Sequence, residues 1–168
     1  MIAETERLII EKFTTKDAPF FKALVNTPHW LKYIGDRNIN TIKDAETYIQ
    51  NTHLKSYESV GFGFYKIILK DTNIPIGSCG LVKRAELEDV DIGFAFLGEY
   101  EKQGFGLEAS KAIMKLAKNE FGIEKLLAIT VPYNTGSVKL IEKLGFKYEK
   151  RVKPFEDDQE LLLFAKIL

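Results

Sequence analysis

Two glycines, Gly104 and Gly106, separate an apolar stretch that ends near Leu97 from a long amphipathic segment. Beyond them, apolar residues recur at helical spacing as far as Phe121, which predicts a helix that begins at the glycines. Glycine lets a ligand approach the backbone closely, and the free N–H groups and positive dipole end of a helix attract an anion, most naturally a phosphate. The alternative is a loop whose glycines only turn the chain.

The same glycines match a dinucleotide-binding fingerprint, glycine-x-glycine-x-x-alanine, which ends here at Ala109. That fingerprint opens a parallel βαβ unit and needs a carboxylate about 20 positions further on, to bind the ribose. Ile129 and Thr130 occupy that place, and too little chain follows to complete a doubly wound sheet. A phosphate-binding loop of the Gly-Lys-Ser/Thr type is also absent. The sequence therefore excludes both common nucleotide-binding loops.

The overall composition is that of an ordinary globular protein. Among 168 residues, 24 basic and 24 acidic side chains give a formal net charge of zero. We expect residues 1–168 to form one domain, and the charge balance predicts neither a nucleic-acid nor a membrane partner. Without a signal peptide or a long apolar run, the cytoplasm is the expected location. Both a monomer and a homodimer are compatible with the sequence.

The pattern of apolar residues predicts a mixed α+β architecture. Helices are expected at residues 15–26 and 41–56, after the two glycines, and in a short segment that ends at Leu144. The expected strands span residues 7–13, 61–69, 75–82, 90–96, 125–131, 146–152 and 161–167. Short links between the strands from residue 61 to residue 96 predict an antiparallel meander.

Two features have no clear place in this pattern. The aromatic segment 28–37 is too irregular to assign: Trp30 either packs in the core or lines a substrate pocket, with Asp36 or Arg37 as a polar contact. The only cysteine, Cys79, lies in a predicted strand, and we interpret it as a small core residue rather than a nucleophile.

A series of short motifs occurs in a fixed order along the chain. They are Thr5-Glu-Arg-Leu8, Ile76-Gly77, Asp91-Ile-Gly-Phe94, Gly104-Phe-Gly-Leu-Glu-Ala109, Asn134-Thr-Gly-Ser137 and Leu144-Gly-Phe146. Together they resemble the GNAT superfamily of N-acetyltransferases, and more narrowly its RimJ/RimL-like branch, which contains the ribosomal-protein N-terminal acetyltransferases. The resemblance spans essentially the whole chain. It implies a mixed, mostly antiparallel central sheet of about seven strands flanked by about four helices.

The resemblance also implies a cofactor, acetyl-CoA, bound between two splayed strands. Its pyrophosphate would lie on backbone N–H groups at the helix start, and its pantetheine arm would pair with the preceding strand. The Asn134 amide would hold the arm, and a backbone N–H near Phe96 would bind the thioester carbonyl. Lys102 and Lys143 either contact phosphates or are solvated surface charges. The implied cofactor-binding residues are Phe94, Phe96, Leu97, Lys102, Gln103, Gly104, Phe105, Gly106, Leu107, Asn134 and Lys143.

Two residues are candidates for catalysis. In the branch that the chain resembles, a serine at the position of Ser137 is the expected partner of the leaving thiolate, although Ser137 could instead cap a helix. Asp91 matches an acidic family position and is the candidate general base. The acidic residues of the turn before it, Glu86, Glu88 and Asp89, either attract a cationic amine or belong to a solvated hairpin.

The sequence departs from the superfamily pattern at two positions. Glu101 replaces a glutamine or arginine of the loop, and Ile141 replaces a tyrosine of the last helix. The predicted function is acetyl-CoA-dependent transfer to a primary amine, on a protein N-terminus or a small molecule, directly within a ternary complex. The alternative is a non-catalytic module on the same fold that binds or senses acyl-CoA.

Overall fold

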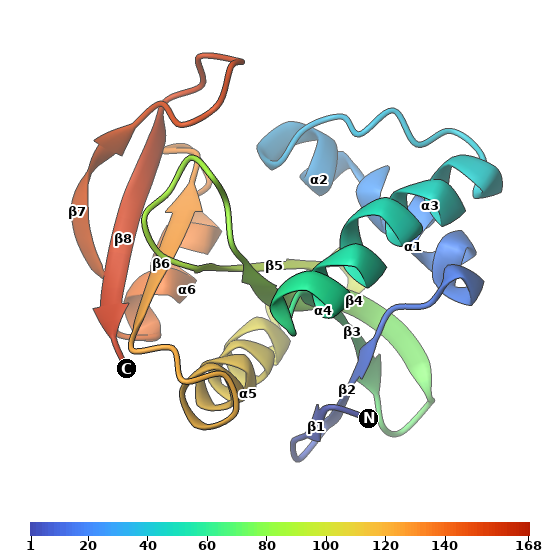
Figure 1. Cartoon of the computed structure of the whole chain (residues 1–168). Coiled ribbons are helices and arrows are strands. Elements are labelled where there is room, and N and C mark those ends of the chain that lie inside the picture. The colour runs from blue at the N-terminus through green and yellow to red at the C-terminus, as the bar shows by residue number, and fades with distance from the viewer.

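The computed structural model describes residues 1–168, which are arranged around one eight-stranded sheet (Figure 1). Its strand order is β1-β2-β3-β4-β5-β6-β8-β7, and only β5 and β6 run parallel. The strands are β1 (Ala3–Glu4), β2 (Leu8–Lys12), β3 (Phe64–Leu69), β4 (Ile74–Val82), β5 (Asp91–Phe96), β6 (Lys125–Thr130), β7 (Lys147–Val152) and β8 (Leu161–Ile167). The expected α+β fold with a mostly antiparallel sheet is confirmed. The strand absent from the prediction is the two-residue β1.

The helices lie on both sides of this sheet. They are α1 (Ala18–Val25), α2 (Pro28–Tyr33), α3 (Ile42–Ile49), α4 (Lys55–Val60), α5 (Phe105–Asn119) and α6 (Thr135–Lys143). In Figure 1, α5 lies on one side of β5, and α1, α2 and α3 lie on the other. None of the helices has the length and apolar character that a membrane span requires.

The aromatic segment that the sequence left unassigned contains helix α2. Its start is fixed by Thr27, whose side-chain oxygen accepts a hydrogen bond from the Trp30 N–H, and by Pro28 in the first turn. A helix of six residues has fewer than two turns, so an apolar period cannot be recognised in it.

The predicted helix 41–56 is longer than expected and is interrupted. Thr41 and Asp44 form a capping box at the start of α3, in agreement with the expected N-terminus. A π-helical turn over Gln50–Leu54 then joins α3 to α4, which ends at Gly61 in a left-handed conformation.

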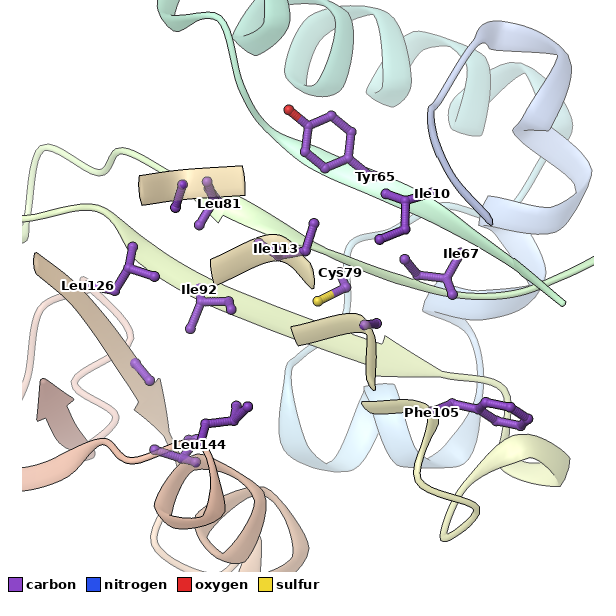
Figure 2. Close-up of a cluster of buried hydrophobic side chains, with 14 of the residues drawn as sticks. Ile10, Tyr65, Ile67, Cys79, Leu81, Ile92, Phe105, Ile113, Leu126 and Leu144 are labelled. Atoms are coloured by element: carbon purple, nitrogen blue, oxygen red, sulfur yellow. The ribbon is translucent and has the colours of Figure 1, made fainter. Parts of the chain in front are cut away.

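The main core lies between the sheet and α5 (Figure 2). From α5, Ala109, Ile113 and Ala117 are fully buried against strand residues such as Leu81 and Ile92. Cys79 belongs to this core, as predicted: it is fully buried, with its Sγ 3.7 Å from Ser110 Oγ of α5. A separate apolar cluster joins α1 to α3 around Phe13 and Phe21.

Candidate active site

The parallel strands β5 and β6 touch at one end and diverge at the other. Asp91 and Leu127 are the only residues paired between them, and the Leu127 N–H donates to the Val90 carbonyl at 2.9 Å. Beyond this pair, β6 continues its pairing with β8 while β5 continues its pairing with β4. The sheet therefore opens into a cleft toward the carboxyl ends of both strands.

The register of β5 determines which backbone groups face this cleft. The Leu97 N–H donates to the Ile76 carbonyl of β4 at 2.9 Å, so odd-numbered residues of β5 direct their backbone groups toward β4. Even-numbered residues direct theirs toward β6, as the Val90 carbonyl does. The N–H and C=O groups of Phe94 and Phe96 consequently face the opening, where no strand pairs with them.

At the wide end of the cleft, α5 begins without a side-chain cap. Its N-cap residue is Gly104, in a left-handed conformation with φ of 84°, whereas α2, α3 and α6 are capped by Thr27, Thr41 and Asn134. The first N–H groups of a helix need partners from outside it, and here no side chain supplies one. The helix start is therefore an available anion-binding position.

The loop before α5 is held by the N-terminal segment. The Arg7 guanidinium donates to the Gln103 carbonyl at 3.0 Å and lies 4.3 Å from the ring centroid of Phe105, which is buried. Arg7 and Thr5 also bind the carboxylate of Glu108 in the first turn of α5. Sequence reasoning gave no role to Thr5, Arg7 or Glu108, although the motifs Thr5-Glu-Arg-Leu8 and Gly104-Phe-Gly-Leu-Glu-Ala109 contain them.

The predicted cofactor-binding side chains differ in what they contact. The Gln103 amide donates to the Glu99 carbonyl at 2.8 Å, and Lys102, in a left-handed conformation with φ of 60°, is exposed. A Cβ on Gly106 would lie 2.9 Å from the Leu140 side chain, so this glycine allows α5 and α6 to pack closely. Lys143 is exposed in the last turn of α6, at the opposite end from Asn134.

Helix α6 places Asn134 and Ser137 at its N-terminus. The Asn134 Oδ1 accepts the Ser137 N–H at 3.2 Å, so Asn134 is the capping residue, and the interpretation of Ser137 as a cap is wrong. The Asn134 amide nitrogen and the Ser137 hydroxyl make no hydrogen bond within the chain. Both groups are thus available to a ligand. Ile141, at the position of the superfamily tyrosine, is buried in the core.

Asp91 lies at the closed end of the cleft, with its side chain on the face of the sheet opposite α5. It is 1% exposed, and its Oδ1 accepts a hydrogen bond from the Arg84 Nε at 2.9 Å. Burial raises the pKa of Asp91 to about 6, against the lowering effect of Arg84. A carboxylate with this pKa is a better proton acceptor near neutral pH than an ordinary one.

The three predicted substrate-binding residues make contacts within their own segment and with the neighbouring helices. Trp30 packs against the cluster of α1 and α3, where its buried Nε1 has no partner, and the Arg37 guanidinium lies 5.8 Å from its ring centroid. The Asp36 carboxylate accepts the Asn38 N–H at 2.8 Å in an exposed turn. These contacts favour the core-packing interpretation of Trp30 and a turn-stabilising role for Asp36.

Two other residues of α2 contact the rim of the cleft. His29 Nδ1 lies 3.3 Å from the Glu101 carboxylate, and the Tyr33 ring lies 5.8 Å from that of Tyr133, between β6 and α6. His29 and Tyr33 are four positions apart, so they share a helix face. Sequence reasoning missed them because the helix itself was not predicted.

Solved acetyltransferase structures share the overall fold of this chain. A GNAT-family acetyltransferase from Bacillus anthracis is 25% identical and superposes with a TM-score of 0.79, covering 98% of this chain and 96% of its own. RimL, a ribosomal L7/L12 α-N-protein acetyltransferase solved with coenzyme A, superposes with a TM-score of 0.83 at 17% identity, covering 99% and 97%. At 17% identity, the likeness to RimL shows a shared fold alone.

Sequence comparison defines the family. The model described as an acetyltransferase (GNAT) domain matches residues 7–147, so the chain belongs to the GNAT acetyltransferases. The uncharacterized N-acetyltransferase YnaD of Bacillus subtilis is 26% identical over 145 residues, which are 86% of this chain and 82% of YnaD. The protein is thus an N-acetyltransferase, and the alternative of a non-catalytic module is not supported.

Proposed function

We propose that the protein transfers an acetyl group from acetyl-CoA to a primary amine, on a protein or peptide N-terminus or on a small molecule. The observation that carries this proposal is the cleft between β5 and β6, whose unpaired backbone groups lead to the uncapped start of α5. An extended ligand arm can pair with the free edge of β5, and the N–H groups at the start of α5 can bind a pyrophosphate. Both features suit coenzyme A.

Different residues of the cleft would bind different parts of coenzyme A. N–H groups in the first turn of α5, with Gly104 and Phe105 at its start, would hold the pyrophosphate, and Phe94 and Phe96 would pair with the pantetheine arm. The free amide of Asn134 would donate to the same arm. Bound acetyl-CoA supplies an acetyl group activated as a thioester, and the Phe96 N–H would hydrogen-bond its carbonyl oxygen.

Proton transfer is assigned to Asp91 and Ser137. A peptide α-amine with a pKa of about 8 costs about 1–1.5 kcal/mol to deprotonate at pH 7, whereas a lysine with a pKa of about 10.4 costs about 4.5 kcal/mol. Asp91, with a pKa raised to about 6, accepts a proton directly or through water from the easier of these amines. The free hydroxyl of Ser137 would protonate the leaving thiolate.

Transfer is proposed to be direct, within a complex of the enzyme, acetyl-CoA and the amine. A covalent acyl-enzyme needs an accessible nucleophile with a lowered pKa. Cys79 is fully buried behind α5, and burial raises the pKa of its thiol to about 12. The only cysteine of the chain is therefore unsuited to carry the acetyl group.

Among possible acceptors, we favour the N-terminus of a protein or peptide. RimL, whose fold the chain shares, is named for acetylating a ribosomal protein at its α-amine, and a further neighbour from Vibrio fischeri is named as a ribosomal-protein-S5-alanine acetyltransferase. The modest base at Asp91 is also better matched to an α-amine than to a lysine.

The test is release of free thiol from acetyl-CoA in the presence of peptides with free N-termini, polyamines and aminoglycosides. We expect turnover with peptides, with a mass increase of one acetyl group on the α-amine. Turnover only with polyamines or aminoglycosides would show that the acceptor is a small-molecule amine and not a peptide N-terminus. Tight acetyl-CoA binding with no turnover on any amine would contradict the enzymatic proposal.

A further inference from the structure

The face of β3, β4 and β5 opposite α5 is lined by small and polar residues. Cys79 contacts α5, so its neighbours Ser78 and Gly80 point to the other face, together with their strand partners Ala95 and Gly93. Asp91 lies on this second face, two residues before Gly93. The first face is covered by α5 and its core, so an amine can approach the cleft only on the side of the sheet where α1, α2 and α3 lie.

One aromatic residue, Phe64 of β3, stands out on this second face. It is paired with Gly80 and is only half-buried. Phe64 belongs to none of the apolar clusters of the protein and makes no aromatic pair, although its neighbours Phe62 and Tyr65 are core residues. A phenylalanine in the middle of a sheet without a core partner leaves apolar surface uncovered.

Two glycines lie against Phe64, one under its ring and one against its backbone. A Cβ on Gly93 would lie 2.8 Å from Phe64 Cε1 and 3.0 Å from Cζ, and a Cβ on Gly80 would lie 2.5 Å from Phe64 Cα. Neither glycine has a positive φ, so conformational freedom does not explain it. Glycine at position 93 lets the Phe64 ring lie directly on the backbone of β5, whereas glycine at position 80 lets the backbones of β3 and β4 lie close together.

We infer that Phe64 is a specificity-determining residue of the acceptor site. Its ring forms the apolar wall against which the group next to the acceptor amine packs, about 7 Å along the strand from Asp91. Because the ring fills the space above Gly93, the wall selects an N-terminal residue with a small side chain, such as glycine, alanine or serine. The inference rests on the proposed function and names the acceptor class of the same site.

The test compares peptides that differ only in their first residue, alanine or leucine. In the wild-type protein we expect kcat/KM to favour alanine, and in Phe64→Ala we expect this ratio to fall about tenfold or more, since hydrophobic pockets discriminate by this order. Affinity for acetyl-CoA, measured by calorimetry, should not change. Phe64→Leu keeps an apolar side chain on the strand and should shift the ratio in the same direction. It replaces Phe64→Ala in this test if that variant does not fold.

Phe121→Ala is the matched control. Phe121 is also half-buried, but it packs against Phe62, with ring centroids 5.4 Å apart, on the side of the main core. Its truncation should lower stability and leave the alanine-to-leucine ratio unchanged. Turnover with an unchanged ratio in both Phe64 variants would overturn the inference alone. Absence of turnover with every amine in the folded wild-type protein would overturn the proposed function, and the inference with it.

Discussion

The Glu108 carboxylate joins the first turn of α5 to the N-terminal segment through Arg7. Arg7 Nε lies 2.7 Å from Glu108 Oε1, and the Arg7 backbone N–H donates to Oε2 at 2.9 Å. The same oxygen accepts the Thr5 hydroxyl. Because Arg7 also binds the Gln103 carbonyl, these contacts hold the cofactor-binding loop in place from behind.

Replacement of Glu108 by Ala should destabilise the protein and loosen this loop. Hydrogen bonds to a charged group are worth about 1.5–3 kcal/mol, and the site is partly exposed, so we expect a loss of about 2 kcal/mol. Urea denaturation measures the loss, and calorimetry should show weaker acetyl-CoA binding. Glu120→Ala, an exposed position at the end of α5, is the control and should change neither quantity.

The contribution of Glu108 should also depend on pH. Partial burial favours its protonated form, but the hydrogen bonds from Thr5 and Arg7 outweigh this effect and lower the pKa. A lowered pKa means that the stabilisation is present above the ordinary pKa of a glutamate and is lost as the pH falls through the folded-state value. The stability difference between the wild type and Glu108→Gln should therefore shrink in acid. A constant difference would contradict the ionic role of Glu108.

Replacement of Gly104 by Val should prevent cofactor binding. The residue has φ of 84°, and a Cβ would lie 3.3 Å from the Arg7 guanidinium that holds the loop, so the substitution should displace the N–H groups proposed to bind the pyrophosphate. Backbone strain of about 1–2 kcal/mol is expected as well. We expect acetyl-CoA affinity, measured by calorimetry, to fall about tenfold or more.

Gly122→Val separates the two effects of that substitution. Gly122 also has a positive φ, of 62°, but nothing lies within 4 Å of the added Cβ. This variant should lose a similar amount of stability and keep its affinity for acetyl-CoA. Equal affinities in the two variants would disprove the assignment of the phosphate position.

Asp91 should make the stability of the protein fall as the pH rises. Its pKa is raised from 3.8 to about 6, so the unfolded chain releases this proton first, between those pH values. Relative to Asp91→Asn, the wild type should lose about 3 kcal/mol in total as the pH rises from well below 4 to well above 6, since each pKa unit corresponds to about 1.4 kcal/mol. Parallel stability curves would show that the pKa is not raised.

The same carboxylate should govern the acidic limb of the activity profile. If Asp91 accepts the proton of the amine, kcat/KM decreases below a pH of about 6 in the wild type. In Asp91→Asn the remaining activity should lose this limb. A limb that persists in Asp91→Asn would assign the base to another group.

Asn134 is predicted to have two separable roles, in α6 and in the cleft. Asn134→Ala removes the helix cap and should cost about 0.5–2 kcal/mol. Asn134→Ser retains a capping oxygen but removes the free amide, so it should remain stable and bind acetyl-CoA more weakly. Thermal unfolding and calorimetry on the two variants give the comparison. Unchanged affinity in Asn134→Ser would exclude the amide from cofactor binding.

Ser137→Ala should affect turnover and nothing else. Because the hydroxyl makes no hydrogen bond within the chain, its removal should change stability by less than about 0.5 kcal/mol. We expect kcat to fall while KM for acetyl-CoA stays constant, the result of an interaction made only in the transition state. An unchanged kcat would remove Ser137 from the mechanism.

The sequence alone determined the elements with a clear period or a strong local signal. The helix after Gly104, the capping box at Thr41 and Asp44, and the glycine that ends α6 all depend on residues close together in the chain. Such local signals do not require knowledge of the neighbouring elements. The short helix α2 gave no such signal, so the contacts of His29 and Tyr33 with the cleft rim could not be predicted.

Tertiary structure alone decided which residues meet. Only the pairing of Asp91 with Leu127 shows where the sheet opens. Only the packing shows why Gly93 and Gly80 are glycines: a Cβ would meet the Phe64 ring at Gly93 and the backbone of β3 at Gly80. It also assigned the helix cap to Asn134 and left the Ser137 hydroxyl free. A burial-dependent pKa, such as that of Asp91, likewise depends on groups far away in the chain, which a sequence lists but does not bring together.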